Sequence, residues 1–157
     1  MFDRILVPLD GGDHAAAALP VAREMARRFG ASLLLLQIVS TAGATAALAA
    51  DVASGAMSDP SVIGGETTVR EQIAESYISA VAEELAGEGF DVAYAVGEGG
   101  GGSGIVDAAQ REGVSLILMA GGQRSGLSRF FTGSVRDHVV HNATVPVLVI
   151  PAVGEDD

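Results

Sequence analysis

Gly133 and Ser134 stand at the predicted start of a helix, where they could bind an anion. The first backbone N–H groups of a helix lack an intrahelical acceptor, and the helix dipole favours negative charge at that end. The preceding loop, Gly121 to Thr132, carries Arg124 and Arg129, and arginine can pair with phosphate. An ordinary helix cap and solvated loop arginines are the alternatives. Phosphate binding is thus one chemistry that these residues allow, whereas the residues taken alone favour the ordinary helix cap.

Asp10 ends an apolar run and precedes two glycines, so its carboxylate either contacts a ligand or caps the turn. His138 and His141 lie three residues apart, and without a third ligand we expect both on the surface. His14 is isolated. The run Gly97 to Gly104 is interpreted as a flexible connector in preference to a phosphate loop, because a glycine run alone is weak evidence.

The composition excludes several classes of function. The chain has 157 residues, with 20 acidic and 9 basic side chains and a net charge of -11, which would repel a nucleic acid backbone. All nine basic residues are arginine and cysteine is absent, so P-loop lysine, Schiff-base and thiol chemistry are excluded. Asp3 and Pro8 interrupt the N-terminus, and no apolar stretch is long enough to span a membrane. We therefore expect a cytoplasmic location without membrane insertion.

Strands and helices are predicted to alternate along the chain. Apolar runs without alternation are typical of strands covered on both faces of a parallel sheet. The predicted strands are Arg4 to Asp10, Ser32 to Val39, Phe90 to Val96, Val114 to Ala120 and Val145 to Pro151. The predicted helices are Asp13 to Phe29, Val69 to Ala86, Ile105 to Glu112 and Gly133 to about Ala143. We expect a single domain over 1–157, with a variable loop at about 40–68 that holds a short helix near 44–53.

Local signals refine the predicted helices. Asp13 is the expected N-cap of the first helix, Pro20 should bend it and Gly30 should close it. Ser103 is the expected cap of the third helix. The second helix is expected to bury one side, formed by Ile73, Tyr77, Ile78, Val81 and Leu85. Right-handed crossovers then give a doubly wound parallel sheet, whose ligands bind beyond the carboxyl ends of the strands.

Three segments resemble the universal stress protein family. They are ILVPLDGGDHAAAAL at the front, RSGLSRFFTGSV before the last helix and VPVLVI at the end, in the order that the family shows. The resemblance implies a Rossmann-like, adenine nucleotide alpha hydrolase-like α/β fold. Its five-stranded parallel sheet would have the order 3-2-1-4-5, with helices on both faces. It also implies a homodimer that binds ATP or AMP, with or without Mg²⁺, and that is no conventional enzyme beyond a slow ATP hydrolysis.

The chain departs from the family's glycine motif, which reads Gly-x2-Gly-x9-Gly-Ser/Thr in the members that bind ATP. Counted back from Gly133, the two earlier glycines fall on Ala120 and Gln123. Side chains there can obstruct the approach of the backbone to phosphates. Gly121 and Gly122 lie beside them and could form a shifted anion site.

The resemblance assigns site residues by their positions in this chain. Asp10 would contact the adenine or ribose end, and Val39 the adenine side, although Val39 is equally a core candidate. The nucleotide-contacting set is Pro8, Leu9, Asp10, Val39, Met119, Ala120, Gly122, Gln123, Gly133, Ser134 and Val135. The last strand would be an edge strand, and an apolar edge is a template for pairing, so Val147, Leu148 and Val149 are the expected dimer interface.

Two functions remain open at this point. The first is an adenine-nucleotide-binding regulatory or signalling dimer. The second is a nucleotide-free dimer that acts through contacts with an unknown partner protein, favoured by Ala120 and Gln123. A hydrolase or oxidoreductase is ranked last, because the chain has no serine elbow and no Gly-x-Gly-x-x-Gly after the first strand.

Overall fold

Five parallel strands form one sheet in the order β3-β2-β1-β4-β5, which confirms the predicted strand order. The computed structural model describes residues 1–39, 60–121 and 133–151. Each neighbouring pair of strands is parallel. The strands are β1 (Arg4–Leu9), β2 (Ser32–Val39), β3 (Val92–Glu98), β4 (Leu116–Ala120) and β5 (Val147–Ile150). Their boundaries agree with the predicted ones to within two residues.

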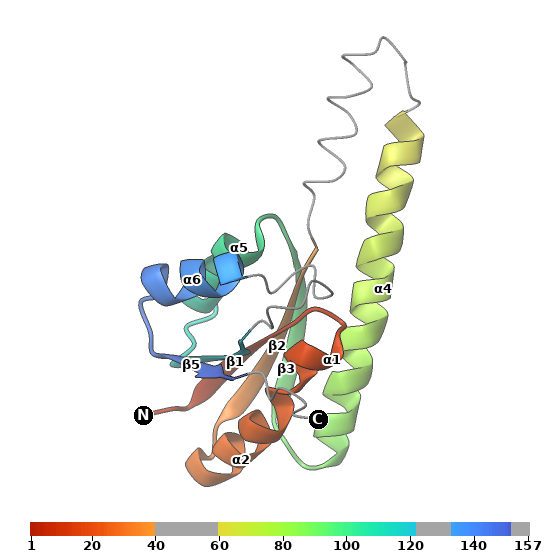
Figure 1. The fold of residues 1–157 in the computed structure, drawn as a ribbon. Coiled ribbons are helices and arrows are strands. Elements are labelled where there is room, and N and C mark those ends of the chain that lie inside the picture. Colours follow the sequence, from red (N-terminus) through yellow and green to blue (C-terminus); the bar gives the residue numbers. More distant parts are fainter. Residues whose placement is uncertain (40–59, 122–132, 152–157) are drawn as a thin grey trace, which may run out of the picture.

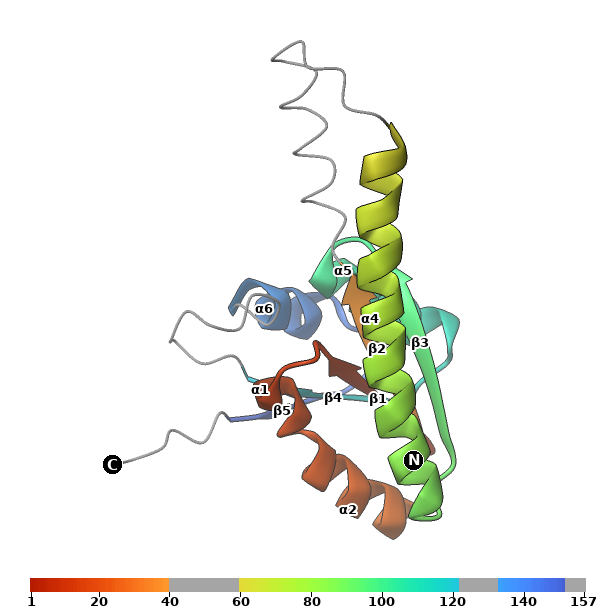
Figure 2. The same ribbon diagram turned by 90° about the vertical axis from the view of Figure 1, so that its right-hand side faces the viewer.

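Helices cover both faces of the sheet, again as predicted (Figures 1 and 2). One face carries α1 (Asp13–Ala16), α2 (Leu19–Phe29) and α4 (Pro60–Gly87), and the other carries α5 (Gly101–Arg111) and α6 (Gly133–Asn142). Within the described ranges, none of these helices combines the length and the apolar character that crossing a membrane requires.

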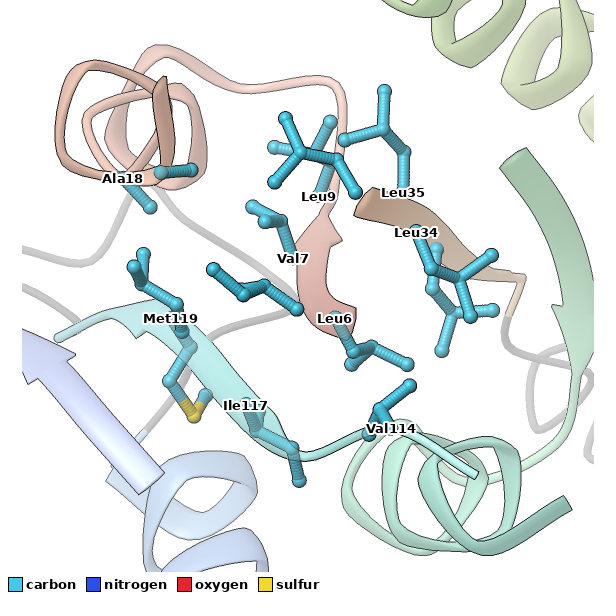
Figure 3. Packing of buried hydrophobic residues seen from close by; sticks show 14 of the residues in the cluster. Leu6, Val7, Leu9, Ala18, Leu34, Leu35, Val114, Ile117 and Met119 are labelled. Carbon is cyan, nitrogen blue, oxygen red and sulfur yellow. The ribbon is translucent and has the colours of Figure 1, made fainter. Parts of the chain in front are cut away.

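The core lies on both sides of the central strands, as Figure 3 shows. All residues of β1 from Ile5 onward and all residues of β4 are buried, without the alternation of a sheet that faces water on one side. The side chains of Leu6, Val7, Ile117 and Met119 have no exposed surface. The edge strand β5 is only partly buried. Its position at the edge explains why it is less buried than the central strands.

The predicted single helix after β1 is two helices. α1 ends at Ala16 and α2 begins at Leu19, with Pro20 in the first turn of α2. A proline ring clashes with the carbonyl four residues earlier, which here belongs to Ala16, so a continuous helix is disfavoured. Gly30 closes α2 in the left-handed conformation, with φ of 63°, as predicted. Asp13 is the first helical residue and not the cap, because Ala16 N donates to the carbonyl of Gly12.

α4 begins at Pro60, so the predicted loop at 40–68 is wrong from residue 60 onward. Proline suits the first turn of a helix because its missing N–H would be unpaired there. The predicted buried side is also partly wrong. Ile78 and Leu85 are buried, but Ile73 is 65% exposed, and the small residues Ala74 and Ala82 face the core in its place. The short helix predicted near 44–53 lies outside the described residues.

The glycine-rich segment after β3 is helical over much of its length, so the flexible-connector interpretation is wrong for 101–104. A Cβ on Gly102 would lie 2.8 Å from His138 Cβ, and one on Gly104 would lie 2.9 Å from Ile38 Cδ1. The two glycines therefore let α5 approach α6 and β2 closely. The hydroxyl of Ser103 donates to the carbonyl of Gly100 at 3.1 Å, within the first turn, and does not cap the helix.

Candidate functional site at the carboxyl edge of the sheet

The winding of the chain reverses between β1 and β4, which are neighbours in the sheet. From β1 the chain proceeds through β2 to β3 on one side, and from β4 it proceeds to β5 on the other. The register of Leu6 with Ile117, continued along both strands, places Leu9 opposite Ala120. Asp10 and Gly121, the next residues, thus lie side by side at the carboxyl ends of these two strands. This is the position at which open α/β sheets bind ligands.

Asp10 is half-buried and caps the turn that follows it. Its Oδ1 accepts a hydrogen bond of 2.8 Å from the N–H of Gly12. Gly11, between them, has φ of 81°, a conformation that favours glycine. Oδ2 accepts no hydrogen bond from the described residues. The turn-capping alternative for Asp10 is therefore present in the structure, and it leaves one carboxylate oxygen for another partner.

The apolar residues assigned to the site lie at the carboxyl ends of β1, β2 and β4. Pro8, Leu9, Val39, Met119 and Ala120 are all buried. Val39 retains 7% exposure and Ala120 5%, whereas Met119 has none. Val39 is thus a core residue in this structure, which is one of the two roles that the sequence left open. Side chains of this set can contact a ligand only through the small exposed surfaces of Val39 and Ala120.

Gly121 cannot supply the shifted anion site suggested by the sequence. Its N–H donates to the carbonyl of Ile150 at 2.6 Å, so the chain continues to pair with β5 beyond Ala120. Gly121 is also buried, and a Cβ there would lie 3.3 Å from the same carbonyl oxygen. Gly122, Gln123, Arg124 and Arg129 lie outside the described residues.

Gly133 and Ser134 do open a helix, as predicted, and α6 runs on to Asn142. α6 connects two parallel strands, β4 and β5, so it runs against the strand direction and its N-terminus belongs to the carboxyl edge. Ser134 is exposed, and Val135 is half-buried against the core. The positive end of the helix dipole thus lies on the same edge of the sheet as Asp10.

The histidines of α6 are surface residues, as expected. His138 and His141 are exposed, and Nδ1 of His141 lies 2.6 Å from the carbonyl oxygen of Asp137. No group of three or more metal-ligating side chains occurs among residues 1–39, 60–121 and 133–151. The side chain of His14 lies outside the described part.

Two polar residues at this edge were not predicted as site residues. Gln37 on β2 is paired in register with Leu9, and its buried Oε1 has no hydrogen-bond partner among the described residues. Tyr77 on α4 is half-buried; burial raises the pKa of its phenol, and the negative charges of Asp10 and Asp13 raise it further. A glutamine inside the run SLLLLQIV was a usable signal. The sequence carried no signal that Tyr77 belongs to the site, because only the packing of α4 brings it near Asp10.

The assigned dimer residues lie on an edge strand. Among the described residues β5 pairs with β4 alone, and Leu148 is 36% exposed while Val147 and Val149 are half-buried.

The doubly wound sheet and its carboxyl-edge site define a Rossmann-like α/β protein. The chain belongs to the universal stress protein family, whose family model matches residues 1–151. It is 28% identical over 153 residues to universal stress protein YxiE of Bacillus subtilis, an alignment that covers 96% of this chain and 99% of that protein. The solved structure of hypothetical protein MJ0577 superposes with a TM-score of 0.79 at 22% identity, covering 99% of both chains.

Two further solved structures of this fold carry nucleotides. The universal stress protein of Archaeoglobus fulgidus in complex with dAMP has a TM-score of 0.61 at 22% identity, and covers 96% of this chain and 99% of its own. A universal stress protein in complex with cAMP has a TM-score of 0.58 at 17% identity, with coverage of 97% and 98%. At these identities the likeness shows the shared fold.

Proposed function

We propose that this universal stress protein is a regulatory or signalling module that binds an adenine nucleotide, ATP or AMP, as a homodimer, and that it is not a conventional enzyme. The observation that supports nucleotide binding most directly is the opening of α6 at Gly133 and Ser134, on the carboxyl edge where the winding reverses. Helix N-termini stabilise phosphate by their N–H groups and dipole. The dAMP and cAMP complexes of proteins with this fold support the same class of ligand.

The charges at this edge orient the nucleotide. Asp10 and Asp13 carry negative charge near the ends of β1 and β2, where phosphates would be repelled, so the neutral base and ribose belong there. The phosphates belong at α6, which follows β4. β2 and β4 are separated by two strand spacings, about 10 Å, which a nucleotide can span. Since the described residues hold no cluster of metal ligands, any Mg²⁺ would be carried mainly by the nucleotide phosphates.

Calorimetric titration with ATP and AMP tests this proposal. Gly133→Val and Ser134→Ala should each weaken ATP binding, because they alter the first turn of α6. Ser32→Ala is the matched control, since Ser32 lies at the amino end of β2 and donates to the carbonyl of Asp3. Unchanged affinity in both α6 variants would refute the assignment of the phosphates to this helix, and absence of binding by the unmodified protein would refute nucleotide binding itself.

The second candidate is a nucleotide-free dimer that acts through contacts with a partner protein. It is favoured by Ala120, which occupies a glycine position of the family motif, and by the hydrogen bond that fixes Gly121 to Ile150. Gly121 thereby offers no donor to a phosphate. If the loop is the obstacle, Ala120→Gly together with Gln123→Gly should create or strengthen ATP binding in the same titration. No gain would show that these two positions do not limit binding.

The homodimer is proposed to form through β5 and not to depend on nucleotide. An unpaired apolar edge strand can pair symmetrically with a second copy. We expect sedimentation equilibrium to give a dimer at micromolar concentration, and Val147→Asp with Val149→Asp to give a monomer. Leu148→Asp is the milder test because this side chain is already 36% exposed. Val140→Asp is the control, because Val140 is an exposed residue of α6. A monomeric unmodified protein, or a Leu148→Asp variant as dimeric as the control, would contradict this interface.

A further inference from the structure

Gln37 is a polar residue in a strand that is otherwise built for the core. Four consecutive leucines precede it on β2, and all four are buried. Oε1 of Gln37 is buried, and no described residue donates a hydrogen bond to it or accepts one from Nε2. An unsatisfied buried polar group is destabilising, and such groups are rare in native proteins. A leucine would fit the pattern of this strand without that cost, which indicates that the amide serves a partner not found among the described residues.

The position of Gln37 shows where that partner would lie. Residues two apart on a strand share a face, so Gln37 is on the same face as Val39, the last residue of β2. In register it lies opposite Leu9, at the end of β1. A Cβ on Gly11 would lie 3.9 Å from Nε2, so the turn that Asp10 caps passes close to the amide. The amide is therefore at the carboxyl edge, on the side to which the charges assign the base.

We propose that Gln37 recognises the base of the bound nucleotide, pairing its amide with the amino group and an adjacent ring nitrogen of adenine. The proposal rests on the proposed function and specifies which part of the ligand this residue contacts. A glutamine amide presents an acceptor beside a donor, and adenine presents a donor beside an acceptor, which is the pairing that glutamine makes with adenine in nucleic acid recognition. Gln37 is only partly buried as a residue, and its buried Oε1 would meet the base after a rotation of the side chain toward the edge.

The neighbouring groups fit a neutral ligand group better than an anion. Asp10 and Asp13 raise the pKa of the Tyr77 phenol, so their negative charges are close to this corner of the edge. A phosphate there would meet the same charges. An aromatic base carries no charge and has polar groups at its rim, which an amide can satisfy.

The test compares two ligands on two proteins by calorimetry. The ligands are ATP and purine riboside 5′-triphosphate, which lacks only the 6-amino group. We expect the unmodified protein to bind ATP about tenfold more tightly than the analogue, the size expected for one hydrogen bond. Gln37→Leu should remove this preference. Gln110→Leu, the same substitution at an exposed position of α5, is the control and should retain it.

Each outcome decides between the alternatives. If the unmodified protein binds both ligands equally, or if Gln37→Leu keeps the preference, the assignment of Gln37 is overturned while nucleotide binding stands. If Gln37→Leu only raises thermal stability and leaves the preference intact, the amide holds a structural water and the inference is likewise overturned. If the unmodified protein binds neither ligand, the proposed function fails and this inference fails with it. Circular dichroism of Gln37→Leu establishes that the variant folds.

Discussion

The two ends of the sheet use their polar groups differently. At the amino end, Oγ of Ser115 accepts from the N–H groups of Asp3 and Arg4, at 3.0 and 3.1 Å, and donates to the carbonyl of Arg4 at 3.0 Å. Arg23 of α2 forms ion pairs with Glu84 and Glu88 near the end of α4. At the carboxyl end, Asp10 bonds only to its own turn and Gln37 has no partner among the described residues. The amino end is built for stability, and the carboxyl end retains polar groups that a ligand can use.

Of the substitutions that test this difference between the two ends, removal of the Ser115 hydroxyl should change stability most. Ser115→Ala should lower the free energy of unfolding by about 1–3 kcal/mol, because the N–H groups of Asp3 and Arg4 lose the hydroxyl that accepts from both. Urea denaturation measures it. Ser79→Ala is the matched control, since that exposed hydroxyl donates only to the carbonyl of Ser76 in its own helix. Equal stability of the two variants would contradict the special role of the amino end.

A substitution at the carboxyl end is expected to have the opposite sign. Gln37→Leu should raise the free energy of unfolding by about 1 kcal/mol, because it removes a buried acceptor that has no partner. The same denaturation experiment measures it, with Gln110→Leu as the exposed control. A loss of stability larger than that of the control would show that the amide already serves the folded structure.

The smallest expected effect concerns Tyr77. Its raised pKa means that the unfolded state releases the phenolic proton first, at a pH of about 10. The contribution of Tyr77 to the free energy of unfolding is therefore fully present below that pH. It is lost as the pH rises through the pKa that the phenol has in the folded state. Ultraviolet titration in a Tyr94→Phe background isolates this residue. Asp10→Asn should lower the pKa of Tyr77 slightly, because burial is the larger cause. Asp3→Asn, at the amino end, should leave it unchanged, and an equal shift in both variants would contradict the proximity of Asp10.

The sequence predicted the sheet well because its signals are local to each strand. Continuous apolar runs such as Ser32 to Val39 identify a strand that is buried on both faces, and their alternation with helices determines the winding. The start of α4 was missed because Gly64 and Gly65 disfavour a helix, whereas a helix anchored elsewhere extends at low cost. The helical packing of Gly102 depends on His138, more than thirty residues away, which no local pattern contains.

The candidate site was predicted in its location more than in its details. Asp10 and the opening of α6 carry signals of their own, a carboxylate after a strand and a glycine-serine helix start. The loss of Gly121 as a donor depends on its pairing with Ile150 across two strands, and the proximity of Tyr77 to Asp10 depends on the path of α4. Such relations between distant segments appear only in the folded chain.

The length of α4 has a consequence for motion. The helix has 28 residues, and its N-terminal half extends beyond the carboxyl edge of the sheet (Figures 1 and 2). Among the side chains of this helix that the structure describes, the buried ones are Ala74, Ile78, Ala82 and Leu85, in the other half. Amide hydrogens there exchange with solvent only when the core itself opens, whereas those of the projecting half can exchange by fraying. We therefore expect amide exchange on two timescales within one continuous helix, with the faster exchange in the half that projects beyond the carboxyl edge of the sheet.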